Sequence, residues 1–202
     1  KYFVPHLFAA FKRQHPEVNL QLTVVNRAQA VRRLSDNRDD LVIMSMVPQD
    51  MGLEFLPFLN NPIVAVVPAD HPLCALGPLR LQDLEPYTLL MREQGSGTRM
   101  ACEEYFKEKR VHFNQTLEVA SNESQRECAV AGLGVALLTR HAVSLELATG
   151  LLCELPVEEL PLYRSWCVVQ AKAKRLSPVA HAFLGFIRSE RLQISALVER
   201  FD

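Results

Sequence analysis

The chain lacks long hydrophobic runs, and its first residues lack the layout of a signal peptide. Every apolar run is shorter than the roughly 18 to 20 residues that span a membrane. The opening residues, Lys1 to His6, do not place basic residues ahead of an apolar stretch. These absences exclude a membrane partner for this segment, and we expect a soluble domain.

Positive charge is not in excess either. The sequence has 22 Lys and Arg residues against 23 Asp and Glu residues, which gives a formal net charge of −1. Proteins that hold nucleic acid do so through clustered Lys and Arg. We therefore expect any DNA binding to come from another module of the whole protein.

Cysteines are present, but they form no paired motif. Because they are scattered, we expect the cysteines to act as small apolar residues in a reducing compartment, rather than to form disulfides or a zinc site. The six histidines are equally dispersed, so we assign none of them to a metal. The five cysteines stand singly, with no C-x-x-C spacing, at Cys74, Cys102, Cys128, Cys153 and Cys167.

Catalytic signatures are missing as well. Gly95-Ser96-Gly97 is not the G-x-S-x-G nucleophile elbow, and the dinucleotide fingerprint fails at Met100, where its last glycine belongs. No G-x-x-x-x-G-K phosphate loop occurs, and the chain offers no convincing pair of acid and base. We expect a protein that is not an enzyme and that needs no cofactor.

What the chain does contain is enough apolar sequence for a packed core, 49% of 202 residues. Helical and strand periodicities alternate, which is typical of an open, mostly parallel α/β sheet, here in two lobes with a break at Asn60-Asn61-Pro62. Because a parallel α/β unit normally begins with a strand, we expect a further strand ahead of Lys1. The expected helices are 3–15, 28–35, 99–110, 122–131, 140–149, 178–188 and 192–201, and the expected strands are 18–24, 41–44, 53–59, 63–67, 87–91, 117–119, 135–138, 151–155 and 163–170.

The loop ahead of the helix that starts near Arg99 is suited to binding an anion. Gly95 and Gly97 permit backbone conformations that side chains forbid, while Ser96 and Thr98 offer caps and hydroxyl groups. The first N–H groups of a helix lack internal partners and lie at the positive end of its dipole. Arg99 adds a planar, two-pronged donor. The same residues also suit a capped loop without a ligand, and the loop alone does not decide between the two interpretations.

More polar groups follow the predicted strands. Ligands of open α/β sheets bind at the carboxyl ends of strands, so we expect Asn26-Arg27, Ser45-Met46 and Asn122 to share one cleft with this loop. Asn122 also predicts a helix N-cap, with Gln125 at the third helical position. We expect Glu93 to orient an arginine rather than to contact the anion.

Seven short stretches, taken together, resemble the effector-binding part of LysR-type transcriptional regulators over nearly the whole chain. The resemblance is closest to the branch that regulates carbon-fixation operons (CbbR or RbcR), whose pattern includes Arg-Glu-x-Gly-Ser-Gly-Thr-Arg and Ser-Asn-Glu. The stretches are Lys1-Tyr2-Phe3-Val4-Pro5, Asn26-Arg27, Asn60-Asn61-Pro62, Asp70-His71-Pro72-Leu73, Arg92 to Arg99, Ser121-Asn122-Glu123 and Ala131-Gly132-Leu133-Gly134.

This resemblance implies an α/β, two-lobed periplasmic-binding-protein-like (type 2) fold with two crossover strands, here 63–67 and 163–170. Lobe I would comprise 1–62 and 170–202, and lobe II would comprise 63–169. The resemblance also implies an N-terminal winged helix-turn-helix that is absent from this fragment and that binds promoter DNA. A cytoplasmic homodimer or homotetramer is expected, and exposed-looking apolar residues, Leu147 and Val198, agree with assembly.

The inducer of this family occupies the cleft between the lobes, and the carbon-fixation branch responds to phosphorylated or carboxylated metabolites. The resemblance thus implies that the domain senses a small anionic metabolite, in agreement with the anion site inferred from the loop. The contact residues that it implies by motif position are Lys1, Asn26, Arg27, Ser96, Thr98, Arg99, Asn122 and Glu123.

The chain departs from this branch after Ile43. The usual Met-Gly-Arg-Pro-Pro is replaced by residues 44–48, Met-Ser-Met-Val-Pro, so an arginine able to meet a second anionic group is missing. A doubly phosphorylated ligand is thereby less favoured. Cys167 and Gln170 also replace the usual Tyr and His in the strand of Trp166, which we expect to be a hinge.

Two other functions remain in view. A receptor that delivers an anion to a membrane permease would use the same fold, although unpaired cysteines disfavour an oxidising compartment. The gene upstream of Lys1 separates the two, because a helix-turn-helix supports the regulator and a signal peptide supports the receptor. An isomerase or lyase would need the acid and base pair that the sequence lacks.

Overall fold

The computed structural model describes residues 1–190 and residue 194. The chain divides into two compact units, which we describe separately. Unit 1 comprises residues 1–60 and 165–202, and unit 2 comprises residues 61–164. Each unit has its own buried core.

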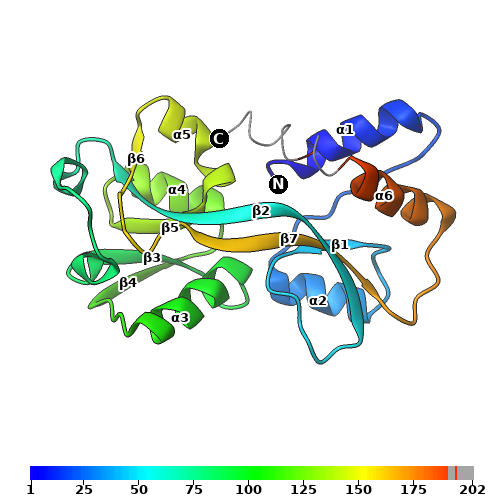
Figure 1. Ribbon diagram of the computed structural model, residues 1–202, viewed down its shortest axis with the longest axis horizontal. Helices are drawn as coiled ribbons and strands as arrows, with labels where there is room; N and C mark the ends of the chain where they lie inside the picture. Colours follow the sequence, from blue (N-terminus) through cyan, green and yellow to red (C-terminus); the bar gives the residue numbers. More distant parts are fainter. Residues whose placement is uncertain (191–193, 195–202) are drawn as a thin grey trace. The chain divides into compact units, whose positions relative to one another are not determined.

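Two long strands contain the boundaries between the units. Strand β2 (Leu53–Pro68) carries the chain from unit 1 to unit 2, and strand β7 (Leu162–Ala171) carries it back (Figure 1). They confirm the two predicted crossover strands. The lobe boundaries expected after residues 62 and 169 fall inside the same strands, whereas the units divide after residues 60 and 164. Because each strand continues through its boundary, the hydrophobic pattern does not mark where a unit ends.

Strand β2 is longer than the sequence indicated. The predicted break at Asn60-Asn61-Pro62 is wrong, because one 16-residue strand continues through it. Pro62 lacks an N–H group, and the register with the next strand begins one residue later, with Ile63 opposite Thr139. The Asn61 side chain is buried and accepts a hydrogen bond of 2.5 Å from the Thr139 hydroxyl. The Asn and Pro cluster therefore marks the unit boundary rather than a turn.

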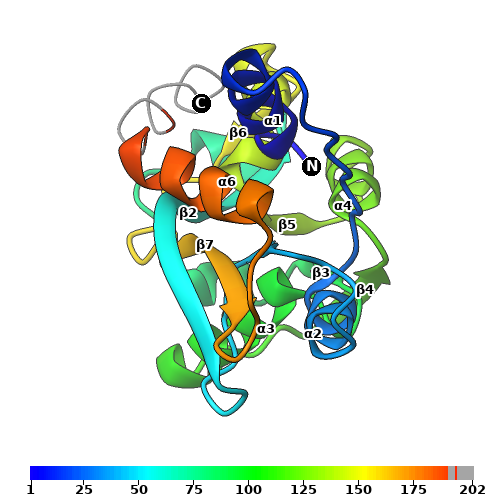
Figure 2. The ribbon, with the colours of Figure 1, turned by 90° about the vertical axis from the view of Figure 1, so that its right-hand side faces the viewer.

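Unit 1 packs two helices rich in aromatic residues, α1 (Val4–Gln14) and α6 (Pro178–Ser189), around one core (Figure 2). Leu7 and Phe11 lie one turn apart on α1 and are fully buried. The Phe11 ring meets Phe183 of α6 edge to face, with the ring centroids 5.1 Å apart. The helices predicted for these two segments are confirmed.

The remaining elements of unit 1 include helix α2 (Arg27–Ser35) and strand β1 (Val42–Met44), which pairs antiparallel with β7. The prediction of a strand over residues 18–24 is wrong, since this segment joins no ladder with the described residues. Leu22 and Val24 accordingly stay exposed. Alternation predicts which side chains face a core, but it does not supply the neighbour that a β-strand must pair with.

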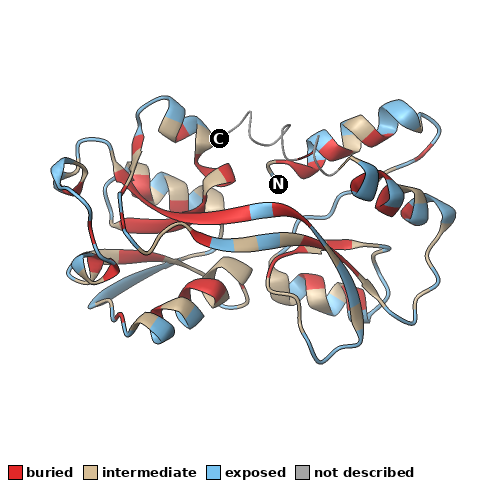
Figure 3. Ribbon diagram, viewed as in Figure 1, coloured by how far each residue is buried: buried red, intermediate tan, exposed pale blue. Residues whose placement is uncertain are grey.

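Unit 2 contains a sheet of mixed direction rather than a mostly parallel one. Strand β3 (Thr88–Arg92) runs parallel to both β4 (Gln115–Val119) and β5 (Val135–Thr139). Strand β2 pairs antiparallel with β5 and with β6 (Leu152–Glu154). Continuous apolar runs look alike in both directions, so the sequence did not reveal this reversal. Strand β5 and residues 61–67 of β2 are buried throughout, as Figure 3 shows.

The helices of unit 2 cover this sheet. Leu147, which looked exposed in the sequence, packs against the core of unit 2. The predicted last helix over 192–201, together with Val198, lies outside the described residues. Within the part of the chain that the structure describes, no helix is long and apolar enough to cross a membrane. The α-helices are α3 (Gly97–Lys109), α4 (Asn122–Val130) and α5 (Ser144–Ala148), and the 3-10 helices are η1 (Pro72–Ala75), η2 (Leu81–Leu84) and η3 (Arg140–Ala142).

Candidate functional site

The candidate site begins in the loop that joins β3 to α3. Gly95 has a φ of +88°, which a side chain would disfavour. Ser96 is buried, and its hydroxyl accepts a hydrogen bond of 3.4 Å from the Arg99 backbone N–H. Ser96 is therefore the N-cap of α3, as the sequence indicated.

Two backbone N–H groups at this helix end have no partner among the described residues. The first intrahelical bond runs from Met100 N to Ser96 O, at 3.1 Å, so the N–H groups of Gly97 and Thr98 precede it. No described residue supplies an acceptor to either group. Both lie at the positive end of the α3 dipole, where an anion is stabilised. The end of α3 therefore has the donors that the sequence predicted.

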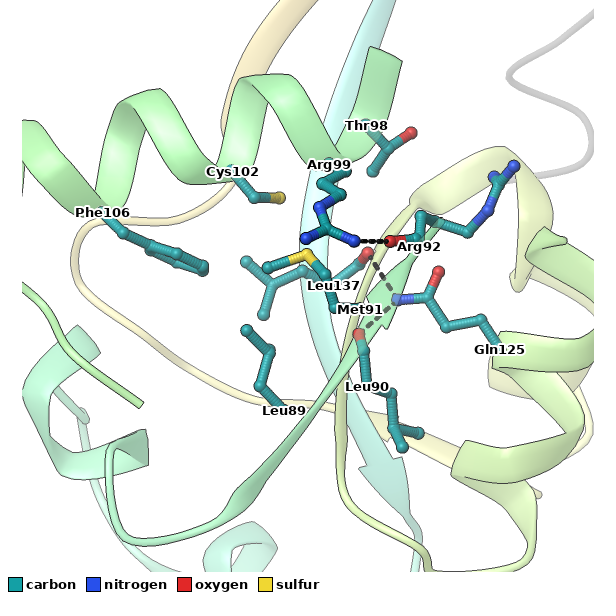
Figure 4. Close-up of a pocket in the computed structure, with 10 residues that line it drawn as sticks. All are labelled: Leu89, Leu90, Met91, Arg92, Thr98, Arg99, Cys102, Phe106, Gln125 and Leu137. Carbon is teal, nitrogen blue, oxygen red and sulfur yellow. Dashed lines mark hydrogen bonds between the residues drawn. The ribbon is translucent and has the colours of Figure 1, made fainter. Parts of the chain in front are cut away.

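Arg99 does not extend from the helix end toward these donors. Its side chain lies under the first turn of α3, and Figure 4 shows its guanidinium and the Thr98 hydroxyl pointing in different directions. Nε donates to Glu103 at 2.7 Å, and Nη1 donates to Glu118 at 2.5 Å and to the Arg92 carbonyl at 2.9 Å. Burial alone lowers the pKa of Arg99, but the hydrogen bonds to Glu103 and Glu118 raise it above the ordinary value. A permanently charged Arg99 thus ties α3 to the ends of β3 and β4.

Arg92, which sequence reasoning missed, connects the loop to the start of α4. Its Nε and Nη2 donate to the Glu93 carboxylate at 2.8 and 3.1 Å, and its Nη1 donates to the Asn122 side-chain oxygen. The Arg92 and Glu93 side chains are only 12% and 19% exposed. Glu93 therefore orients an arginine, as expected, and that arginine is its chain neighbour. The available signal was a charged pair placed directly after a buried strand.

The start of α4 differs from the prediction by one residue. Ser121 is the N-cap, and its hydroxyl accepts a hydrogen bond of 3.0 Å from Ser124 N. Asn122 is the first helical residue, and Glu123 follows it in the first turn. A serine hydroxyl and an asparagine amide cap a helix equally well, so adjacent caps cannot be ranked from sequence. This placement leaves the Asn122 side chain available to Arg92.

Gln125 is the second residue that the sequence misassigned. Its side chain does not return to the helix end as a capping partner but enters the interior, where the residue is 1% exposed. Nε2 donates to Leu90 O at 2.6 Å and to Leu137 O at 3.2 Å, which joins β3 to β5 (Figure 4). Its Oε1 is buried and has no hydrogen-bond partner within the described part of the chain. Gln125 therefore fixes the end of α4 over the two strands.

The floor beneath Arg99 is apolar. Cys102 is buried there, and burial raises the pKa of its thiol to about 12. This cysteine therefore packs as a small apolar residue, in agreement with the sequence. The residues that surround the hollow between α3 and the sheet are Leu89, Leu90, Met91, Arg92, Thr98, Arg99, Cys102, Phe106, Gln125 and Leu137 (Figure 4).

The three candidate residues of unit 1 lie at its N-terminus and at the start of α2. Asn26 caps α2 in a capping box with Gln29, since each side chain accepts from the backbone N–H of the other, at 3.0 and 3.2 Å. Arg27 is the first helical residue, and its Nε donates to the Met46 carbonyl at 2.5 Å. Lys1 is exposed.

Met46 lies in the segment where the sequence differs from the pattern of the carbon-fixation branch. It has a φ of +54°, which is uncommon for a residue with a side chain. This conformation accompanies the hydrogen bond from Arg27 to its carbonyl oxygen. Residues 44–48 thus lack the arginine of that pattern, but their backbone binds a different arginine, Arg27.

The structure thus gathers the predicted residues into two local groups. In unit 2, Ser96 caps α3, Thr98 and Arg99 lie in its first turn, and Arg92 connects their loop to Asn122 of α4. In unit 1, Asn26 and Arg27 share the start of α2. The residues described by the structure form no cluster of three or more His, Cys, Asp or Glu side chains that could hold a metal ion.

Comparison with known proteins identifies the family. The family model of the LysR substrate binding domain matches residues 1–191. The HTH-type transcriptional activator CmpR of Synechocystis sp. is 39% identical over 187 residues, which cover 93% of this chain and 62% of that protein. The RuBisCO operon transcriptional regulator of Allochromatium vinosum is 39% identical over 189 residues, which cover 94% of this chain and 63% of that protein. The chain therefore spans less than two thirds of the length of these curated relatives.

Among solved structures, the Synechocystis CcmR regulatory domain in complex with 2-PG matches with a TM-score of 0.88 and 34% identity. The match covers 93% of this chain and 90% of that one. The architecture is thus that of an α/β, periplasmic-binding-protein-like (type 2) binding domain. The chain belongs to the LysR substrate binding domain family, and regulators of carbon-fixation genes are among its relatives.

Proposed function

We propose that the chain is the effector-sensing domain of a LysR-type transcriptional regulator and that it binds a small phosphorylated or carboxylated metabolite. The observation that carries this proposal is the pair of unpartnered N–H groups, those of Gly97 and Thr98, at the positive end of α3. The 2-PG bound to the related CcmR domain supports an anionic ligand.

In unit 2 we propose that the anionic group accepts from these two N–H groups and from the Thr98 hydroxyl. Ser96 holds the helix end in place through its cap. Arg99 and Asn122 are positioning residues, because Arg99 is bound to Glu103 and Glu118 and Asn122 is bound to Arg92. Glu123, in the first turn of α4, limits the anion to one side of the loop through repulsion.

In unit 1 we propose Lys1, Asn26 and Arg27 as the remaining contacts. Arg27 is the strongest of these, because the partner of its Nε is a neutral carbonyl and its positive charge stays available to a ligand. Asn26 positions α2 through its capping box, and the exposed ammonium of Lys1 adds long-range attraction.

For the whole protein we propose that effector binding changes how promoter DNA is held by a helix-turn-helix outside this chain. A ligand shifts such an equilibrium only by its difference in affinity for the two states, typically about 1 to 3 kcal/mol. We propose a cytoplasmic homodimer or homotetramer that controls carbon-fixation genes, and a binding rather than an enzymatic role. The names of the relatives, all regulators, support this assignment.

The site is tested by a substitution that removes one of the two N–H groups. Gly97 is the first residue of α3, where proline is tolerated, and Ser96 already has the extended ψ of 134° that a following proline requires. Calorimetry of the chain with phosphoglycolate, ribulose bisphosphate, phosphoglycerate, phosphoenolpyruvate and NADPH identifies the ligand. For that ligand, Gly97→Pro is expected to weaken binding about tenfold or more, the loss of one charge-assisted hydrogen bond.

The matched control is Gly97→Ala, which adds a side chain but keeps the N–H group. It is expected to bind within about twofold of the parent chain. If Gly97→Pro binds the anion as tightly as Gly97→Ala and the parent chain do, the helix end is excluded as the binding site. A panel in which no anion binds would exclude the sensing function itself.

A further inference from the structure

Two cysteines far apart in the sequence lie together in unit 2. Cys153 belongs to β6, and the antiparallel register places it opposite Val67 of β2. Cys74 belongs to η1, and its sulfur lies 3.5 Å from the carbonyl oxygen of Pro68, the residue after Val67. Both cysteines are therefore anchored at the same end of β2, whose last residues run beside β6 (Figure 1).

The two thiols are in direct contact. Their side chains interact with each other at this end of β2, and both residues are partly exposed. Burial, together with the hydrogen bond and the charge interaction with Cys153, raises the pKa of Cys74 to about 11. Among the described residues, Cys102 and Cys167 are buried, and Cys128 is partly exposed without a contact to another cysteine. Cys74 and Cys153 therefore combine contact with access to solvent.

We propose that Cys74 and Cys153 form an oxidisable dithiol that closes to a disulfide when the protein meets a low-molecular-weight disulfide such as oxidised glutathione. Because burial disfavours the thiolate form of Cys74, Cys153 makes the first attack, and its proton passes to the departing glutathione. Cys153 forms a mixed disulfide and releases one glutathione thiol. The Cys74 sulfur then attacks Sγ of Cys153, and its proton passes to the departing second glutathione. Two protein thiols are oxidised and one glutathione disulfide is reduced to two thiols.

The bond would enclose the part of unit 2 that carries the candidate anion site. The residues between Cys74 and Cys153 include β3, α3, β4, α4 and β5. A cross-link over such a long loop restricts the unfolded chain strongly. The oxidised form is therefore expected to unfold at a temperature higher by about 5 °C or more.

The experiment uses the reduced 202-residue chain and an excess of oxidised glutathione. Thiols are counted in denaturant before and after, and peptides are mapped by mass spectrometry without reduction. We expect a peptide pair linked through Cys74 and Cys153, the loss of two titratable thiols from this pair, and a glutathione adduct at most on Cys128. The Cys128→Ser variant, which alters a cysteine of similar exposure, is expected to form the same linked pair.

The Cys74→Ser variant separates contact from simple access. Without the resolving sulfur, Cys153 is expected to keep its glutathione adduct, and the rise in unfolding temperature is expected to disappear. The proposal is overturned if the parent chain keeps both thiols free while Cys128 is modified. It is equally overturned if Cys74 and Cys153 each retain a glutathione adduct with no bond between them.

Discussion

Arg27 in unit 1 and Arg99 in unit 2 both lie in the first turn of a helix, but their charges are balanced in opposite ways. Arg99 is paired with Glu103 and Glu118 beneath its helix. Arg27 donates to a neutral carbonyl, and no carboxylate among the described residues pairs with it. A cation at a helix N-terminus opposes the helix dipole, and a bound anion would relieve this. The difference indicates that Arg99 holds the scaffold, whereas Arg27 suits contact with the ligand.

Among the variants that test this difference between Arg27 and Arg99, Arg99→Ala is expected to have the largest effect. The change removes three hydrogen bonds and leaves two carboxylates without their partner, so the free energy of unfolding should fall by about 2 to 3 kcal/mol. Urea denaturation measures it. Lys107→Ala, which removes an exposed charge from the same helix, is the control and should change the value by less than about 0.5 kcal/mol. Equal effects of the two variants would show that Arg99 does not secure α3.

A smaller effect, on binding rather than stability, is expected from Arg27→Ala. Loss of an unpaired guanidinium should weaken binding of the anion identified by calorimetry about 10- to 30-fold, or about 1.4 to 2 kcal/mol. Stability should change by less than about 1 kcal/mol, because the loss of the hydrogen bond to Met46 opposes the gain from removing a cation at the positive end of α2.

The matched control is Arg32→Ala, which removes the same charge from the last turn of the same helix, where the residue is exposed. Its affinity should stay within about twofold of the parent chain. If Arg32→Ala weakens binding as much as Arg27→Ala does, Arg27 contributes only to the general electrostatic field and not to a contact.

The smallest effect is expected from Glu118→Gln, which keeps the shape of the Arg99 partner but removes its charge. The Glu118 side chain is 56% exposed, so solvent screens the pair, and the free energy of unfolding should fall by only about 0.5 kcal/mol. The same variant leaves Arg99 with more uncompensated positive charge, so anion affinity should rise about twofold. Urea denaturation and calorimetry on one preparation measure both. A fall in anion affinity would contradict the assignment of Arg99 as a paired scaffold residue.

Local signals in the sequence predicted most of the elements and the helix end of the candidate site. Gly95, Ser96 and Gly97 carry their structural meaning within a few residues, because a positive φ and a cap are properties of the local backbone. Local periodicity also predicted strands over residues 63–67 and 163–170, whereas their role as crossover strands came from the family resemblance. The direction and the pairing of strands were not predictable. Residues 18–24, for example, alternate like a strand, yet they pair with no described neighbour.

The parts that escaped prediction depend on contacts between distant residues. Arg99 looked like a free donor because Glu118, its partner, lies on another strand. Gln125 looked like a capping residue because the carbonyl groups that its side chain binds belong to β3 and β5. Cys74 and Cys153 looked isolated for the same reason, since only the register of β6 on β2 brings them together. The chemical properties of single residues could be predicted from the sequence. Which distant residues contact one another could be known only from the folded structure.

The unbroken course of β2 through the unit boundary restricts how the gene for this protein can change in length. Val64 and Val66 face the core that contains Ala129, and successive residues of a strand point to opposite sides. Deleting one codon between Asn60 and Ile63 would shift the strand by one residue. The side chains of Val64 and Val66 would then point to the opposite face of the sheet, away from that core. Natural insertions and deletions in this lineage should therefore accumulate in loops and spare the middle of β2, even where its individual amino acids vary.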